Sequence, residues 1–192
     1  MTNLRTTLFG KRRRPTDADK PIEVYGDVIQ VPRFGRRETV PAGTKWDRRF
    51  MGIASSEVSR WSKDPSTKVG CVIVSPDRRQ IATGYNGFPA GIDDSLTRLM
   101  NKEIKNKLTV HAELNAILNA RVDLAGWTLY VTKPPCINCA TAIIQAGIKK
   151  VVCPPVEQKS SWAKSQAEAW AILTEAGVKV VGILKEHRRN AI

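Results

Sequence analysis

Residues 127–153 read WTLYVTKPPCINCATAIIQAGIKKVVC and contain the pattern that decides the fold. Trp127 to Thr132 is rich in aromatic and β-branched residues, which predicts a strand. After two prolines, the apolar residues of Ile137 to Ala146 recur at helical spacing, and Lys150 to Cys153 is again short and β-branched. The stretch therefore predicts a strand, a helix and a second strand in succession.

The segments on either side continue this alternation. Apolar residues between Trp46 and Trp61 recur at steps of three and four, which predicts an amphipathic helix that Pro65 stops. The other predicted elements are a hairpin of strands Val69 to Ser75 and Gln80 to Tyr85, helices His111 to Asn119 and Trp162 to Glu175, and a strand from Val178 to Leu184. We expect a three-layer α/β/α domain with a mixed sheet of about five strands.

Residues 1–43 differ in composition from the rest of the chain. They are rich in Arg, Pro and Gly, which predicts a basic, loosely ordered N-terminal extension before a domain formed by residues 44–192. Within this extension, Ile22 to Val31 alternates and could form an edge strand or lie along the core. An ordered arm in an oligomer is an alternative. A transit peptide is another, because the first 16 residues contain no acidic side chain.

The composition narrows the class of protein. The 31 Lys and Arg residues outnumber the 18 Asp and Glu residues, which gives a formal net charge of +13. This charge suits a solvated surface, a polyanion partner or a phosphorylated small molecule, so nucleic acid is not excluded. Four cysteines and the lack of a signal-peptide pattern indicate a reducing, cytoplasmic location. No apolar run reaches the roughly 18 to 20 residues that cross a membrane, so we expect no membrane partner.

Two short motifs carry the chemistry. Cys136 and Cys139 are three positions apart in the first turn of a predicted helix, which places them on one face and favours their ionisation. His111 and Glu113 are only two positions apart, so both reach one site only if His111 sits at the helix cap. If the two helix starts meet, His111, Cys136 and Cys139 form the three-ligand set of a catalytic zinc site, which leaves the fourth position to water.

Each motif alone has a simpler interpretation. A lone CxxC pair is often redox-active or structural, and a glutamate on a helix is more often a solvated charge. A structural zinc site would need a fourth Cys or His, and Cys71, Cys153 and His187 do not lie in a ligand pair. The combination His111-x-Glu113 with Pro135-Cys136-x-x-Cys139 is instead the signature of zinc-dependent nucleobase deaminases. In that chemistry Glu113 is the catalytic proton carrier and zinc is the cofactor.

Four stretches make the resemblance more specific. Residues 64–74, 84–94, 111–117 and 135–148 resemble deoxycytidylate (dCMP) deaminases of the cytidine and deoxycytidylate deaminase family. The resemblance implies a cytidine-deaminase-like fold and the hydrolysis of dCMP to dUMP and ammonia in pyrimidine nucleotide metabolism. It also implies a homo-oligomer under allosteric control by pyrimidine triphosphates, with the loop from Gly87 to Asp94 in the region that resembles the effector site.

The resemblance also suggests substrate contacts. By residue-to-residue transfer, Asn86 is expected to contact the sugar and Lys68 the phosphate. Family members often carry a Tyr or Arg just after the fourth strand that helps to hold the substrate, whereas here the chain reads Cys153-Pro154-Pro155-Val156-Glu157 and then Ser160-Ser161-Trp162. This departure weakens the expectation that the protein contacts the phosphate and prefers a monophosphate.

Two alternatives remain open at this level. A tRNA-editing adenosine deaminase would share the zinc site and suit the basic charge. A non-catalytic, zinc-stabilised binding module would use the basic surface, but it would not need Glu113, which is not required to hold the metal.

Overall fold

The protein is described from a computed structural model, which covers residues 24–25, 28–33, 36–41, 43–157 and 159–183. Near the N-terminus, β1 (Val24–Tyr25), β2 (Val28–Arg33) and β3 (Arg36–Pro41) pair in a separate three-stranded antiparallel sheet. The sequence suggested at most one strand in this region, so the pairing is a difference from expectation. The predicted loose ordering of residues 1–23, and His187, lie outside the described residues.

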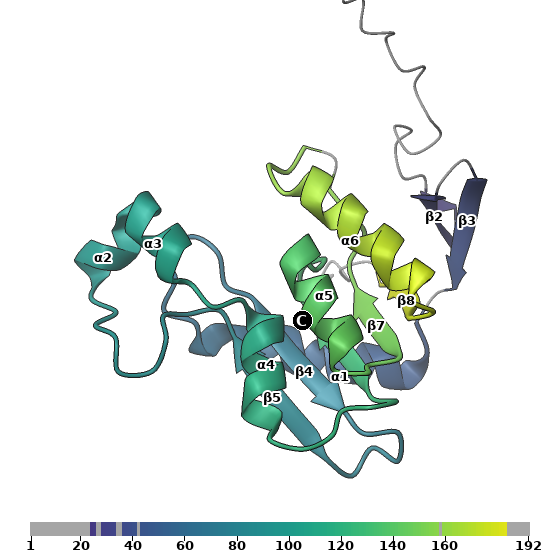
Figure 1. Cartoon of the computed structure of the whole chain (residues 1–192), viewed down its shortest axis with the longest axis horizontal. Helices are drawn as coiled ribbons and strands as arrows, with labels where there is room; N and C mark the ends of the chain where they lie inside the picture. Colours follow the sequence, from purple (N-terminus) through teal and green to yellow (C-terminus); the bar gives the residue numbers. More distant parts are fainter. Residues whose placement is uncertain (1–23, 26–27, 34–35, 42, 158, 184–192) are drawn as a thin grey trace, which may run out of the picture.

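A five-stranded mixed sheet forms the centre of the domain (Figure 1). Its strands are β4 (Gly70–Val74), β5 (Ile81–Tyr85), β6 (Thr128–Val131), β7 (Lys150–Cys153) and β8 (Lys179–Gly182), in the spatial order β5-β4-β6-β7-β8. The loop of residues 75–80 joins β4 to β5, and these strands are antiparallel. Helices separate β6, β7 and β8, which run parallel. The expected mixed sheet of about five strands is confirmed.

Helices cover both faces of this sheet. On one face, α1 (Lys45–Ser56) packs Phe50 and Ala54 against residues of the central strands. On the other face lie α4 (Ala112–Ala120), α5 (Ile137–Gln145) and α6 (Ala163–Glu175), which bury a second and larger apolar cluster (Figure 1). The three-layer arrangement therefore agrees with the expectation from the sequence. Among the described residues, none of the helices has the length and apolar character needed to span a bilayer.

The first helix is shorter than its apolar pattern suggested. α1 ends at Ser56, and a 3₁₀ turn, η2 (Val58–Trp61), follows in place of further α-helix. The hydroxyl groups of Ser55 and Ser56 both donate to the carbonyl of Gly52, at 3.2 and 2.6 Å. Such side-chain bonds compete with the regular helical ladder, which gives a physical reason for the early end.

Two short helices were not expected from the sequence. α2 (Leu96–Met100) and α3 (Lys102–Leu108) lie between β5 and α4 and project to one side of the domain (Figure 1). Asn101 caps α3 by accepting hydrogen bonds from the main-chain N–H groups of Glu103 and Ile104. The residues of α3 are half-buried or exposed, so the helix carries no apolar stripe that a sequence pattern could reveal.

Candidate metal centre

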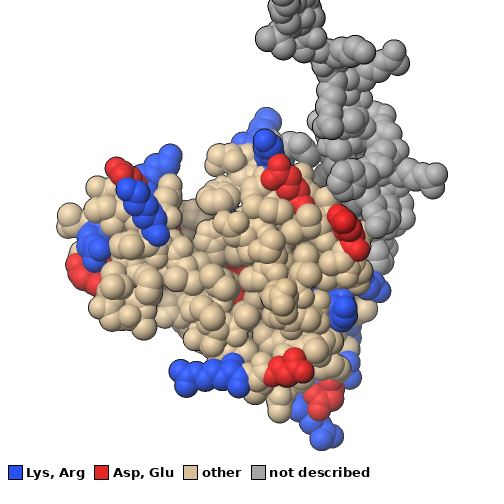
Figure 2. Space-filling model, viewed as in Figure 1, with Lys and Arg blue, Asp and Glu red and all other residues tan. Residues whose placement is uncertain are grey.

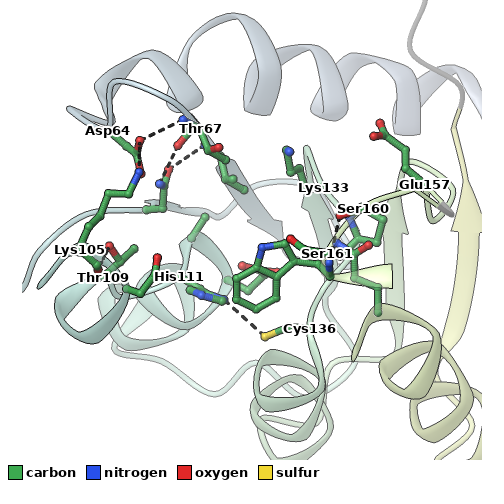
Figure 3. A pocket seen from close by; sticks show the side chains of 18 of the residues that line it. Asp64, Thr67, Lys105, Thr109, His111, Lys133, Cys136, Glu157, Ser160 and Ser161 are labelled. Carbon is green, nitrogen blue, oxygen red and sulfur yellow. Dashed lines mark hydrogen bonds and ion pairs between the residues drawn. The ribbon is translucent and has the colours of Figure 1, made fainter. Parts of the chain in front are cut away.

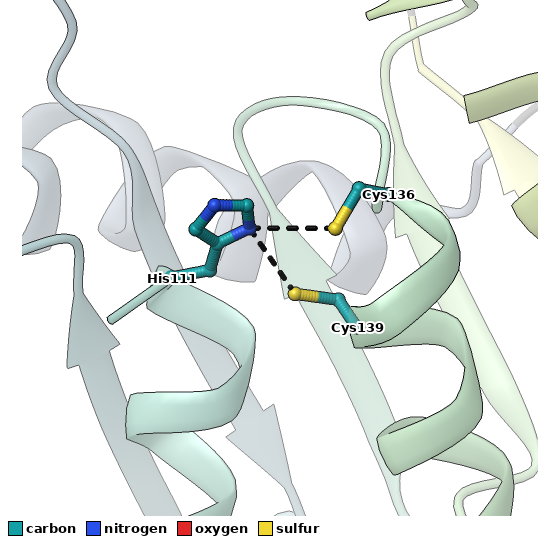
Figure 4. Close-up of side chains that lie close together, drawn as sticks. All are labelled: His111, Cys136 and Cys139. Carbon is teal, nitrogen blue, oxygen red and sulfur yellow. Dashed lines mark hydrogen bonds between the residues drawn. The ribbon is translucent and has the colours of Figure 1, made fainter. Parts of the chain in front are cut away.

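The starts of helices α4 and α5 meet above the sheet, and each contributes side chains to one cluster. His111 is the N-cap of α4 and Cys136 the N-cap of α5, both with extended backbone, and Cys139 follows one turn into α5. The Nδ1 atom of His111 lies 3.4 Å from the Sγ atom of Cys136 and 3.4 Å from that of Cys139 (Figure 4). The sequence predicted that His111 and Glu113, two positions apart, could reach one site only if His111 were the helix cap. His111 does occupy that position.

α4 can approach the sheet closely because glycine occupies position 84. A Cβ atom at Gly84, on β5, would overlap the main chain of α4 at Ala112 and Ala116. The first turn of α4, with His111 and Glu113 at its start, is therefore held directly against the sheet.

The three side chains suit a zinc ion. Their ligand atoms all lie within 4.8 Å of one another. In a tetrahedral site, a zinc–nitrogen bond of about 2.0 Å and a zinc–sulfur bond of about 2.3 Å place such atoms roughly 3.5 Å apart. The observed nitrogen–sulfur separations agree with this spacing, and the set of one imidazole and two thiols is typical of zinc.

The electrostatics favour a thiolate in this cluster. A hydrogen bond from the Cys139 thiol, with a second from His111, lowers the pKa of Cys136 to about 4 although burial opposes the shift. The same contact with Cys136 raises the pKa of His111, and the nearby charge of Glu113 raises it further. The lowered pKa favours the thiolate of Cys136, which is the form that binds metal.

Glu113 is buried beside this cluster. Its side chain lies in the first turn of α4 and only 4% of the residue is exposed, so the interpretation as a solvated charge does not hold. Burial raises the pKa of Glu113 to about 7. A carboxyl group at this place, outside the three-ligand cluster, is available to exchange protons with a bound molecule.

A cavity of about 580 Å³ opens beside the cluster, and His111, Glu113 and Cys136 line part of it. Figure 3 shows Asp64 and Lys105 at one end, Lys133, Glu157 and Ser160 at the other, and His111 and Cys136 between them. On the face shown in Figure 2, the Lys, Arg, Asp and Glu side chains gather toward the edges, and the middle is largely uncharged. A volume of this size accommodates a small molecule.

The two expected substrate contacts differ in their placement. Asn86 lines the cavity, and its amide is partly used by the protein: Oδ1 accepts from the main-chain N–H of Val69 at 2.7 Å, and Nδ2 donates to the carbonyl of Thr67 at 2.9 Å. Lys68 is exposed and donates to the carbonyl of Ser62. Among the described residues that line the cavity, Lys68 does not occur, whereas Lys105, Lys133 and Lys159 do.

Some cavity residues were missed by sequence reasoning. Lys105 belongs to α3, which the spacing of apolar residues did not reveal. Trp162 lies next to His111, with ring centroids 5.7 Å apart and the rings nearly perpendicular at 75°. The signal for Trp162 was present in the sequence, because it falls in the stretch that departs from the family pattern. Cys71 and Cys153, in contrast, are fully buried in β4 and β7 and belong to the core.

Comparisons with known proteins agree with this site. Residues 44–154 match the protein family described as the cytidine and deoxycytidylate deaminase zinc-binding region. A relative from Aliivibrio fischeri, called an uncharacterized deaminase in the luxG 3' region, is 45% identical over 139 residues, which cover 71% of this chain and 92% of the relative. A probable deoxycytidylate deaminase from Caenorhabditis elegans is 41% identical over 154 residues, which cover 78% of this chain and 70% of the relative.

A solved structure extends the likeness to three dimensions. The dCMP deaminase of cyanophage S-TIM5, in complex with dCMP and dUMP, is 26% identical and superposes with a TM-score of 0.55. The match covers 73% of this chain and 98% of that protein. The fold expected from the sequence is thereby confirmed.

Proposed function

The chain belongs to the family of zinc-dependent cytidine and deoxycytidylate deaminases, and from that premise we propose that it hydrolyses dCMP to dUMP and ammonia. The proposal rests above all on the buried Glu113 beside the converging side chains of His111, Cys136 and Cys139. These groups line or adjoin one cavity large enough for a nucleotide. The cyanophage enzyme of similar fold, solved with dCMP and dUMP, supports this choice of substrate.

We assign the metal ligands to His111, Cys136 and Cys139. Zinc held by this set lowers the pKa of water to about 7 and so supplies hydroxide at neutral pH. The cap positions of His111 and Cys136 point both side chains out of the helix ends toward each other, so little rearrangement is needed for binding.

Glu113 is the proton carrier in this proposal. Its carboxylate takes a proton from the attacking water and delivers it to the ring nitrogen next to C4 of cytosine. The water oxygen bonds to C4 as a hydroxyl group. Glu113 then takes the remaining proton from this hydroxyl and passes it to the amino nitrogen, so that the bond from C4 to nitrogen breaks, ammonia leaves and C4 keeps a carbonyl oxygen. Glu113 is buried except where it lines the cavity, so a substrate bound in the cavity would separate its carboxyl group from bulk water.

We propose that Asn86 contacts the sugar. Each bond that its amide makes to Val69 and Thr67 uses one lone pair or one N–H group, so Oδ1 keeps a second lone pair and Nδ2 a second N–H group. The internal bonds fix the orientation of the amide before any ligand enters, which favours binding.

For the phosphate we propose Lys133 and Lys159. Both line the cavity and are exposed, whereas Lys105 is engaged with Asp64 and Ser66. Lys68, expected from the sequence to make this contact, donates to Ser62 away from the cavity lining. We therefore favour Lys133 and Lys159 over Lys68.

We also propose a homo-oligomer and control by pyrimidine triphosphates, as the family resemblance implies. The exposed apolar side chains of Leu118 and Val122 at the end of α4 support an interface between copies. Light scattering tests the oligomer, and steady-state kinetics with and without dCTP or dTTP test the control. A monomer under all conditions would contradict the oligomer, and unchanged kinetics with either triphosphate would contradict the control.

Ammonia release tests the substrate. Zinc-loaded protein is incubated with dCMP, dCTP, deoxycytidine and a tRNA stem-loop that contains adenosine. We expect turnover of dCMP above all others. Preference for dCTP or for the stem-loop would overturn the assignment of dCMP, and absence of turnover with every substrate would favour the non-catalytic binding module.

A further inference from the structure

The first turn of α6 contacts the metal site, although α6 lies beyond residues 44–154, which carry the family match. Trp162, the N-cap of α6, meets the ring of His111 nearly edge-on. Two further residues of the same turn, Ser165 and Gln166, reach the segment that carries Cys136. The turn therefore touches ligand-bearing segments from both α4 and α5.

Ser165 completes the start of α5. Its Oγ atom accepts a hydrogen bond of 3.1 Å from the main-chain N–H of Ile137, 28 positions away in the sequence. Ile137 is the first residue of α5, where a main-chain N–H has no partner within its own helix. The bond fixes the peptide group immediately after Cys136.

Gln166 binds the main chain on the other side of Cys136. Its Nε2 atom donates a hydrogen bond of 3.1 Å to the carbonyl of Pro134, and only 8% of Gln166 is exposed. A buried amide whose donor is satisfied in this way gives a well-defined orientation. The bonds from Ser165 and Gln166 thus lie on either side of Cys136, two residues before it and one residue after it.

We propose that Ser165 and Gln166 are positioning residues for the metal site, which hold the main chain around Cys136 so that its sulfur faces His111. The inference rests on the zinc site of the proposed function. It follows from the main chain: the peptide groups from Pro134 to Ile137 set the direction of the Cys136 side chain, and α6 anchors both ends of that segment. Residues that orient metal ligands typically contribute roughly 10- to 100-fold to metal affinity.

The test measures zinc release in the absence of substrate. Zinc-loaded wild type, Ser165→Ala, Gln166→Leu and the double variant are mixed with an excess of a chromogenic chelator, and the rate of zinc transfer is followed. Lys164→Ala is the matched control, because Lys164 lies on the same turn with an exposed side chain. Ser165→Thr keeps the hydroxyl acceptor and serves as the conservative variant.

We expect roughly 10-fold faster release for each single variant and more for the double variant, with Lys164→Ala and Ser165→Thr close to wild type. Thermal melting of the zinc-stripped proteins separates positioning from a general structural role. In the positioning role, Ser165→Ala and Gln166→Leu melt close to Lys164→Ala. A lower melting temperature in the stripped and loaded forms alike, with an unchanged release rate, would overturn the inference.

The outcomes remain distinct from those for the proposed function. If the wild type holds zinc but turns over no nucleotide, the substrate assignment fails and the inference stands on the release rates. If the wild type retains no zinc after loading, the metal assignment fails, and the inference fails with it.

Discussion

The Nζ atom of Lys105 lies 3.2 Å from the Oδ1 atom of Asp64, 41 positions earlier in the chain, and this ion pair joins helix α3 to the loop before β4. Both side chains are largely buried and line the cavity. Lys105 also donates to the hydroxyl of Ser66 at 2.7 Å. The loop that receives these bonds continues to Thr67 and Val69, which hold the amide of Asn86.

Removing the charge of Lys105 should loosen this end of the cavity. We expect Lys105→Met to lower the free energy of unfolding by about 2 kcal/mol, because the buried Asp64 carboxylate loses a charged partner. The Michaelis constant for dCMP should rise as the loop that holds Asn86 loses support. Urea unfolding and steady-state kinetics measure the two effects.

Lys107→Met is the matched control on the same helix. Lys107 pairs with Glu103 at 2.7 Å, but both side chains are exposed, so the loss should stay below about 0.5 kcal/mol. Equal losses for the two variants would contradict the role given to Lys105.

Asp47 should control the stability of the protein in acid. Its carboxylate accepts hydrogen bonds from Lys150 at 2.6 Å, from Tyr130 at 3.0 Å and from the main-chain N–H of Thr44 at 2.8 Å. Burial by itself raises the pKa of Asp47, but the bonds from Lys150 and Thr44 outweigh it, so the pKa is lowered. The stabilisation is therefore present at neutral pH, above the pKa of an unfolded aspartate near 4, and disappears as the pH falls toward the lower folded value.

We expect Asp47→Asn to lower the free energy of unfolding at pH 7 by about 3 kcal/mol, because Lys150 loses its partner. The variant should also flatten the loss of stability below about pH 4. Urea unfolding at a series of pH values gives the comparison, with the exposed carboxylate variant Asp123→Asn as control. If Asp47→Asn and wild type lose stability in parallel below pH 4, the assignment to Asp47 is wrong.

Variants of Glu113 and Cys139 should differ in whether they lose zinc binding together with turnover. Glu113→Ala should retain zinc and lose roughly 10²- to 10⁴-fold in kcat, since the proton carrier is gone while the three ligands stay. Cys139→Ala should lose both zinc and turnover. Elemental analysis and ammonia release on the same preparations measure the pair. A Glu113→Ala protein that loses its zinc would place Glu113 among the ligands.

The choice of lysines for the phosphate can be tested by comparing substrates. We expect Lys133→Ala and Lys159→Ala each to raise the Michaelis constant for dCMP roughly 10-fold, because a charge-assisted contact to the phosphate is lost. The constant for deoxycytidine, which has no phosphate, should change little. Lys68→Ala serves as the comparison at an exposed lysine outside the cavity lining. A larger effect for Lys68→Ala would restore the assignment made from the sequence.

Much of the fold could be predicted because its signals are local. The run from Trp127 to Cys153 carries strand, helix and strand patterns that depend on neighbouring residues, and the structure has β6, α5 and β7 in these places. Helix α3 escaped prediction because it lacks an apolar stripe, although Asn101 at its cap was a readable signal. The early end of α1 depends on the hydrogen bonds that the Ser55 and Ser56 hydroxyl groups donate to the carbonyl of Gly52. The spacing of apolar residues carries no information about these bonds.

The sequence by itself determined the order of the core elements and the residue types of the metal site, since helical period and cap positions act over a few residues. Only the tertiary structure decided which distant side chains meet. His111 and Cys136 are 25 positions apart, and their approach depends on how α4 and α5 pack on the sheet. The same holds for the ion pair of Lys105 with Asp64 and for the hydrogen bond between Ser165 and Ile137. It also holds for Lys68, which bonds to Ser62 and lies outside the cavity lining. The partner of a lysine or a hydroxyl group depends on how the helices and loops are placed, and the local sequence does not specify this.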